Sequence, residues 1–138
     1  MWILYALLSA VFAAAVAILG KIGLKNVDST LATTIRAVVM ALFLVGAATV
    51  LQKFSLFKTV SNHTLTFIIF SGIAGALSWL FYFFALKYGP ASGVTALDRL
   101  SVVFVVILAA IFLGEALTAK SVLGLLFIVG GALLLVLK

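Results

Sequence analysis

Five long apolar segments, separated by short polar connections, make up nearly the whole sequence. They cover residues 3–22, 29–51, 64–86, 91–113 and 119–137. Each has the length of about 20 residues that a helix needs to cross a hydrocarbon core of about 30 Å. Backbone groups find no water in that layer, so each segment must be helical. We therefore predict an all-α membrane protein, in which residues 1–138 form one domain of five transmembrane helices.

The fourth segment carries an acid and a base inside its apolar run. Asp98 and Arg99 lie about 10 Å from the start of this helix at Ala91. At about 100° per residue, they share one arc of the helix with Ser92 and Thr95. An ionisable group at this depth costs a few kcal/mol unless it faces protein or water. The pattern predicts a polar site on one face of the first half of this helix.

The second and third segments place further polar and aromatic residues at a similar depth. Arg36 can pair with Asp98 and neutralise buried charge. Alternatively, two arginines against one aspartate leave a positive charge that receives an anionic or zwitterionic substrate. Trp79 and Tyr82, near Ser78, suit either an interfacial aromatic belt or the wall of a substrate cavity. Both pairs of alternatives remain open at this level.

The last segment has small residues along one face. Gly124, Ile128 and Gly131 share that face, where two membrane helices could come close together. Such a surface serves packing within the bundle equally well. We predict that it forms a dimer interface.

Composition excludes several classes of protein. The chain is 67% hydrophobic and only 9% charged, whereas about a quarter of the residues of a soluble domain are charged. It has no cysteine and one histidine, His63, which argues against metal sites, catalytic triads and disulfides. One acid and no histidine or cysteine within the segments leave little catalytic machinery. We expect a membrane protein that is not an enzyme and uses no metal or cofactor.

The net charge of +6 comes from basic residues spread singly over connections and helix ends. A nucleic-acid interface would cluster them, so we expect membrane lipid as the partner of these residues. The two sides of the membrane receive almost equal numbers of lysines, which predicts insertion in both orientations. One side has Lys53, Lys58 and Lys120, and the other has Lys21, Lys25, Lys87 and Lys138.

Residues 81–135 carry a recognisable pattern. It combines the aromatic end of the third segment, the connection Leu-Lys-x-Gly-Pro-Ala-Ser, the triplet Leu113-Gly114-Glu115 and a glycine-containing last segment. This pattern resembles the C-terminal part of the EamA domain of the drug/metabolite transporter superfamily, and the order of spans and loops matches over the whole chain. The resemblance implies a transporter.

The same resemblance implies a partner. Most members of that family are about twice as long, with two such domains in opposite orientations, so a second copy would complete this chain as an antiparallel homodimer. The related small multidrug resistance proteins use a glutamate in their first span. The first segment here has no acid, which argues against antiport of cationic drugs.

Together these features predict a multi-pass cell-membrane protein that is a secondary transporter of a small polar or amphipathic metabolite, acting by alternating access as an inverted-topology dimer. The alternative is a non-transporting or flippase-type membrane subunit paired with another small protein. The candidate substrate- or ion-binding residues are Arg36, Ser78, Trp79, Tyr82, Thr95, Asp98 and Arg99.

Overall fold

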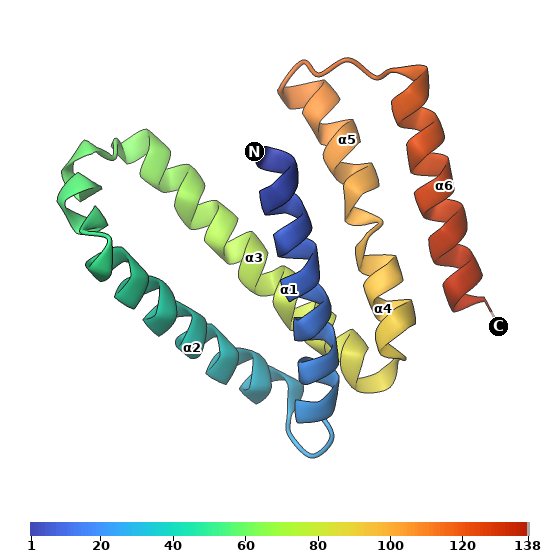
Figure 1. The fold of residues 1–138 in the computed structure, drawn as a ribbon, viewed down its shortest axis with the longest axis horizontal. Coiled ribbons are helices and arrows are strands. Elements are labelled where there is room, and N and C mark those ends of the chain that lie inside the picture. The colour runs from blue at the N-terminus through green and yellow to red at the C-terminus, as the bar shows by residue number, and fades with distance from the viewer. Residues whose placement is uncertain (138) are drawn as a thin grey trace. The chain divides into compact units, whose positions relative to one another are not determined.

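A computed structural model describes residues 1–137 and shows an all-helical chain with five helices long and apolar enough to cross a membrane (Figure 1). This confirms the predicted fold class. The predicted segment bounds agree with those of the five candidate spans to within two residues at each end. Lys138, one of the lysines in the charge comparison, lies outside the described residues. The helices are α1 (Trp2–Gly23), α2 (Ser29–Val50), the 3₁₀ helix η1 (Lys53–Thr59), α3 (Asn62–Tyr88), α4 (Ala91–Asp98), α5 (Ser101–Phe112) and α6 (Ala119–Val136).

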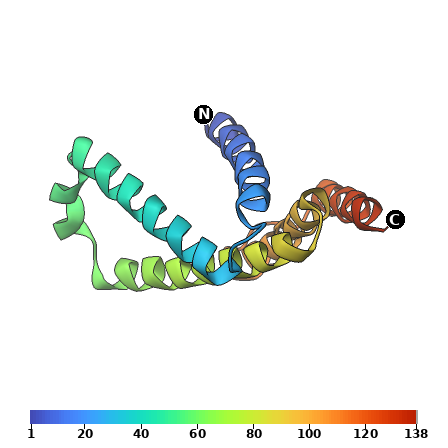
Figure 2. The same cartoon turned by 90° about the horizontal axis from the view of Figure 1, so that it is seen from below.

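The chain divides into two compact units, which are described separately. Residues Gly20–Lys87 form the first, here called the α2–α3 unit. Met1–Leu19 and the chain from Tyr88 onward form the second, here called the α4–α6 unit. In the α2–α3 unit, α2 and α3 run antiparallel and η1 connects them. They converge at the end where α2 begins and diverge toward η1 (Figures 1 and 2).

Two lysines fasten the converging end of the α2–α3 unit. The Nζ atom of Lys21 donates hydrogen bonds to the carbonyl groups of Leu86 and Lys87 at the end of α3. The Nζ atom of Lys87 donates to the carbonyl of Val27, 3.3 Å away. The last carbonyls of a helix lack intrahelical partners and carry partial negative charge, so a lysine is favourable there. Lys21 therefore joins α1 to α3.

Close packing supports the same end of the unit. A Cβ atom added to Gly20 would lie 3.3 Å from the ring of Phe83 and 3.5 Å from Leu86. Glycine lets α1 approach α3 closely here. Phe83 and Leu86 are 4% and 0% exposed, and Leu24, just after α1, is 2% exposed. These residues form the small buried core of the unit.

Asp28 fixes the start of α2. Its Oδ1 atom accepts hydrogen bonds from the backbone N–H groups of Thr30 and Leu31, at 2.8 and 3.0 Å. This is the geometry of an N-cap. The N–H of Leu31 is the main cause that lowers the pKa of Asp28 below its ordinary value, and the N–H of Thr30 and the charge of Lys87 act in the same direction. The carboxylate of Asp28 therefore serves as the N-cap of α2.

In the α4–α6 unit, α4 packs against α6. A Cβ atom added to Gly93 would lie 3.7 Å from Val136 of α6 and 3.3 Å from Pro90. The turn after α5 depends on Gly114, whose φ of +69° is favourable only for glycine. The N–H of Glu115 then reaches back to the carbonyl of Ala109, at 3.2 Å, and closes the end of the helix.

The fourth span is not one continuous helix, which corrects the sequence-based prediction. It has the expected length, from Ala91 to Phe112, but α4 ends at Asp98 and α5 begins at Ser101. Across the break, the N–H groups of Leu100, Val102 and Val103 bond to carbonyls only three residues back. This tighter pattern is typical of 3₁₀ turns and of hinges within helices.

The break has no proline or glycine, the usual causes of a kink. The two residues of the break, Arg99 and Leu100, are good helix formers, but the flanking Asp98 and Ser101 are weaker ones, because aspartate and serine side chains compete for backbone hydrogen bonds. The interruption therefore falls where the sequence places its two adjacent charges, Asp98 and Arg99.

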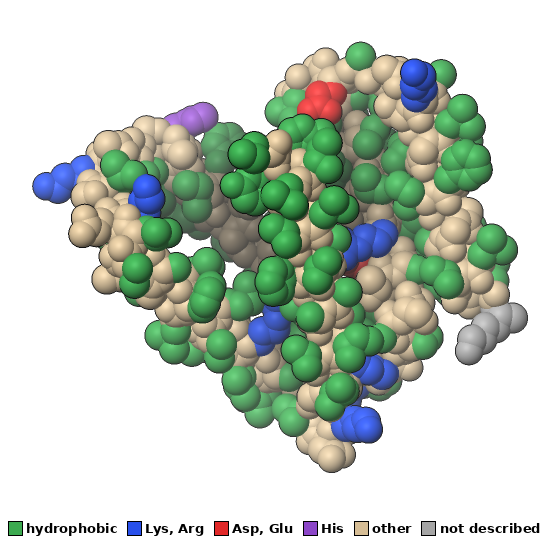
Figure 3. All heavy atoms as spheres, viewed as in Figure 1, with side chains coloured by type: hydrophobic (Ala, Val, Ile, Leu, Met, Phe, Trp, Pro, Cys, Tyr) green, Lys and Arg blue, Asp and Glu red, His purple; other side chains and the backbone are tan. Residues whose placement is uncertain are grey.

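Many large apolar side chains are exposed, and they appear in green along the helices on the face that Figure 3 shows. Phe43 of α2 and Phe127 of α6 are 74% and 77% exposed. Such exposure would be unusual in a soluble monomer, but lipid tails satisfy it. The exposed faces of these helices are lipid-facing or partner-facing surfaces.

Candidate functional site

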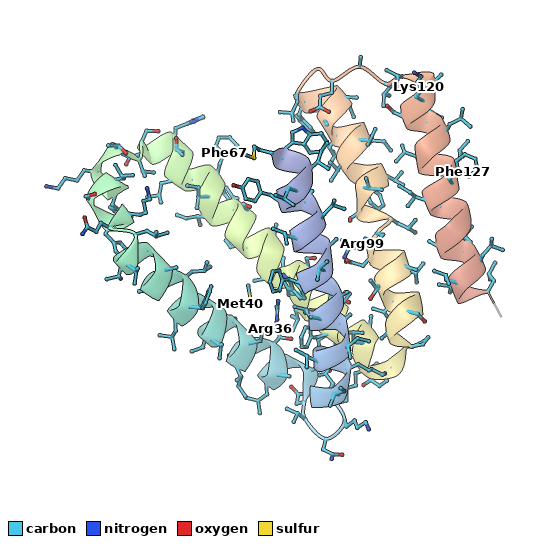
Figure 4. All side chains as sticks on the ribbon, in the orientation of Figure 1. Arg36, Met40, Phe67, Arg99, Lys120 and Phe127 are labelled. Atoms are coloured by element: carbon cyan, nitrogen blue, oxygen red, sulfur yellow. The ribbon has the colours of Figure 1, made fainter. Side chains whose placement is uncertain are left out.

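The α2–α3 unit brings Arg36 against the aromatic residues of α3. Arg36 lies in the second turn of α2, about 10 Å from its start. Its Cζ atom is 3.6 Å from the ring centroid of Trp79 and 5.5 Å from that of Phe83. The first distance is that of a guanidinium stacked face to face on an indole, a favourable cation–π contact. Arg36 and Met40 project from the same side of α2 (Figure 4).

Three rings on α3 form this aromatic wall, which we call the Trp79 cluster: Trp79, Tyr82 and Phe83. Their spacing of three and four residues places them on one side of the helix. Trp79 meets the other two rings edge to face, with centroids 5.5 Å from Tyr82 and 6.1 Å from Phe83. These contacts hold the indole in the orientation that covers Arg36.

The structure thus joins three of the predicted site residues, Arg36, Trp79 and Tyr82, within one unit. Phe83 was missed, although it is the most buried ring of the cluster. Its position four residues after Trp79 was the signal that could have found it. Ser78 is exposed, and its predicted role stays a prediction.

The charge of Arg36 is not balanced within its own unit. Residues 20–87 contain one acid, Asp28, and its side chain caps α2. Burial of a charge without a paired acid is unfavourable in a membrane. Here the negative faces of the rings supply part of the compensation.

The α4–α6 unit holds the remaining predicted residues, Thr95, Asp98 and Arg99. Thr95 and Asp98 are partly buried, whereas Arg99 is exposed. The carbonyl of Thr95 accepts the N–H of Arg99, at 3.2 Å, in the last regular turn before the break. In a continuous helix, the N–H groups of Leu100 and Val102 would bond to Ala96 and Asp98. They are directed to Leu97 and Arg99 instead, so the break changes the polar backbone surface beside the carboxylate.

The predicted pairing of Arg36 with Asp98 would join the two units, and it stays a prediction. The same holds for the idea that Arg36 and Arg99 together receive one substrate.

The predicted dimer face is open on the described part of α6. Gly124, Ile128 and Gly131 are exposed, and a Cβ atom added to either glycine would meet nothing within 4 Å in the same chain. Such a surface is compatible with a close partner, and equally with lipid.

Among residues 1–137, no three histidine, cysteine or acidic side chains gather in a way that could hold a metal ion. The candidate residues are therefore one covered cation and three rings in the α2–α3 unit, and, described separately, the broken helix of the α4–α6 unit.

Comparison of the sequence with known proteins identifies the family. The model of the EamA-like transporter family matches residues 1–137. The chain belongs to the EamA-like transporter family. As a family member with five spanning helices, it is a multi-pass membrane transporter, and the resemblance seen in the sequence is confirmed.

Two relatives show how this EamA-like domain is used in other proteins. A Sinorhizobium protein named "Uncharacterized transporter in cobO 3'region" is 42% identical over 134 residues, which are 97% of this chain and 95% of that protein. The pseudopaline exporter CntI of Pseudomonas aeruginosa is 32% identical over 77 residues, 56% of this chain and 27% of that protein. CntI is therefore about twice as long as this chain. No solved structure matches the chain at a significant level.

Proposed function

We propose that this EamA-like protein is a secondary transporter that moves a small polar or amphipathic metabolite by alternating access. The observation that carries the proposal is the guanidinium of Arg36, held within a membrane span over Trp79 at 3.6 Å. A chain whose function was only structural would gain nothing from this charge, because leucine or phenylalanine would pack there at lower cost. A negatively charged group of a substrate would pair with the arginine, and this pairing would explain why a charge is kept within the span.

We assign roles to the candidate residues from the chemistry of their side chains. Arg36 and Arg99 would hold a negative group of the substrate or neutralise Asp98. Asp98 is the one acid within the described spans and is the proton-responsive group if transport is coupled to protons. Thr95, Ser78 and the Trp79 cluster would line the path. The broken fourth span supports this proposal, since discontinuous helices occur at the binding sites of many transporters.

The test uses purified protein in liposomes with a defined panel of radiolabelled amino acids, monocarboxylates and dicarboxylates. We expect uptake of at least one solute, and a loss of about tenfold or more in the double variant Arg36→Ala with Asp98→Asn. Normal uptake by that double variant would remove the assigned site. No uptake of any solute by the wild-type protein alone would favour the non-transporting subunit.

We propose further that two copies assemble with opposite orientations. Two facts support this. The charge bias across the membrane is nearly flat, and CntI is about twice as long as this chain, whereas the Sinorhizobium relative is of the same length. The natural chain has no cysteine, so single cysteines at Gly124 or Gly131 can be cross-linked without background.

Reporters fused to the C-terminus provide the orientation. Comparable signal from both sides of the membrane is expected, together with cross-linking of a Gly124→Cys copy to a Gly131→Cys copy, since antiparallel α6 helices place these two positions opposite each other. Signal from one side only would replace the inverted dimer by a parallel dimer or by a complex with another protein.

A further inference from the structure

The surroundings of Arg36 carry information about the charge of the substrate. Its guanidinium lies over two aromatic rings, those of Trp79 and Phe83. Met40, one turn further along α2, is 41% exposed and adds a thioether to the same side. The site therefore combines one full positive charge with apolar, polarizable surface.

The stacking on Trp79 determines which part of the Arg36 guanidinium can bind a ligand. The Cζ atom lies 3.6 Å from the ring centroid of Trp79, which leaves no room for a guanidinium nitrogen to point into the ring. We infer that the planar guanidinium lies roughly parallel to the indole, with its N–H donors directed outward along its edges. Two parallel N–H groups of this kind match the two oxygens of a carboxylate. The geometry favours an anion that approaches edge-on.

The same unit offers little to a cationic group. Its one acid, Asp28, accepts hydrogen bonds from Thr30 and Leu31 at the start of α2. An indole face is the best aromatic surface for an ammonium group, and one face of Trp79 is already occupied by Arg36. Within this unit, an ammonium group would lose its water without gaining an acidic partner.

We propose that the ligand of this site is an amphipathic organic anion, with one carboxylate bound edge-on by Arg36 and an apolar body against Met40 and the exposed parts of Trp79 and Tyr82. Zwitterions and cations of the same shape are rejected. This narrows the substrate class of the proposed transport function, on which it rests.

Three probes of nearly equal shape test the charge preference directly: 3-phenylpropanoate is an anion, phenylalanine a zwitterion and phenethylamine a cation. The chain has two tryptophans, so Trp2→Phe leaves Trp79 as the one indole that reports binding by its fluorescence. We expect 3-phenylpropanoate to bind to the protein in nanodiscs at least about tenfold more tightly than either other probe. Empty nanodiscs measure partition of each probe into lipid.

Variants identify the residue responsible. Arg36→Gln should weaken binding of 3-phenylpropanoate by about tenfold or more. Arg36→Lys should keep only part of the affinity, because lysine keeps the positive charge but lacks the planar group with paired N–H donors that stacks on the indole. Lys25→Gln, which removes an exposed positive charge near the end of α1, is the matched control and should bind like the parent protein.

The outcomes separate the two proposals. Equal binding of anion and zwitterion, or binding unaffected by Arg36→Gln, would overturn the anion preference while uptake in liposomes still supported a transporter. Binding of none of the three probes would also overturn it. Absence of uptake of every panel solute would count against the transport function itself, even if 3-phenylpropanoate bound.

Discussion

The two units treat charge within a membrane span in different ways. In the α2–α3 unit, Arg36 sits in an unbroken helix and is covered by the Trp79 cluster. In the α4–α6 unit, the helix stops at Asp98, and Arg99 lies exposed in the break. Packed aromatic side chains accommodate the charge of Arg36, whereas at Asp98 and Arg99 the backbone itself departs from the regular α-helix. A covered charge suits a fixed binding group, whereas charges at a break suit a segment that changes conformation.

The largest expected effect concerns the ring that covers Arg36. Trp79→Ala removes both packing and the cation–π contact, and we expect a loss of about 2–3 kcal/mol in the free energy of unfolding. Trp79→Phe should lose less, because a smaller ring remains over the guanidinium. Unfolding of detergent-solubilised protein, followed by circular dichroism, measures both. Trp2→Ala is the control, since Trp2 is 77% exposed and its loss should change stability little.

A smaller effect is expected at the lysine that joins α1 to α3. Lys21→Met removes the donor to the carbonyls of Leu86 and Lys87, and we expect a loss of about 1 kcal/mol, reduced from the buried value because the site is partly exposed. Lys21→Arg should keep most of the stability. If Lys25→Met, on the exposed side, destabilises the protein equally, the specific role of Lys21 would be refuted.

The break in the fourth span should be visible in amide hydrogen exchange. We expect the amides of Leu100, Val102 and Val103 to exchange about tenfold faster than those of Val38 and Val39 in the continuous α2, because their hydrogen bonds are of the weaker 3₁₀ type. Measurement by mass spectrometry in nanodiscs gives the comparison. Equal protection of the amides at the break and in α2 would mean that the break does not weaken the backbone hydrogen bonds of the fourth span.

The smallest effect is a pH dependence at Asp28. Its pKa is lowered in the folded protein, so its capping contribution is fully present above the ordinary value of 3.8 and is lost as the pH falls through the lowered pKa. Asp28→Asn should remove this dependence while keeping a weaker cap. Unfolding midpoints of both proteins between pH 3 and pH 7 provide the test, and parallel curves would contradict it.

The location of the site could be predicted in part from particular residues of the sequence. The depth of Arg36 and the aromatic run after Ser78 indicated a site on the second and third spans, because helical rise and periodicity are regular. Phe83 was missed because periodicity gives a face of a helix but not which neighbour covers it. The break after Asp98 was missed because neither proline nor glycine marks it.

By itself, the sequence determined that the chain is a five-span membrane protein, since only helices satisfy their backbone groups in lipid and each span must have a minimum length. It also determined which spans carry charge. Only the tertiary structure decided that Arg36 stacks on Trp79, that Lys21 bonds to the end of α3, and that the fourth span is divided. These depend on distances between residues remote in the chain and on competition among nearly equal backbone hydrogen bonds, which no local pattern encodes.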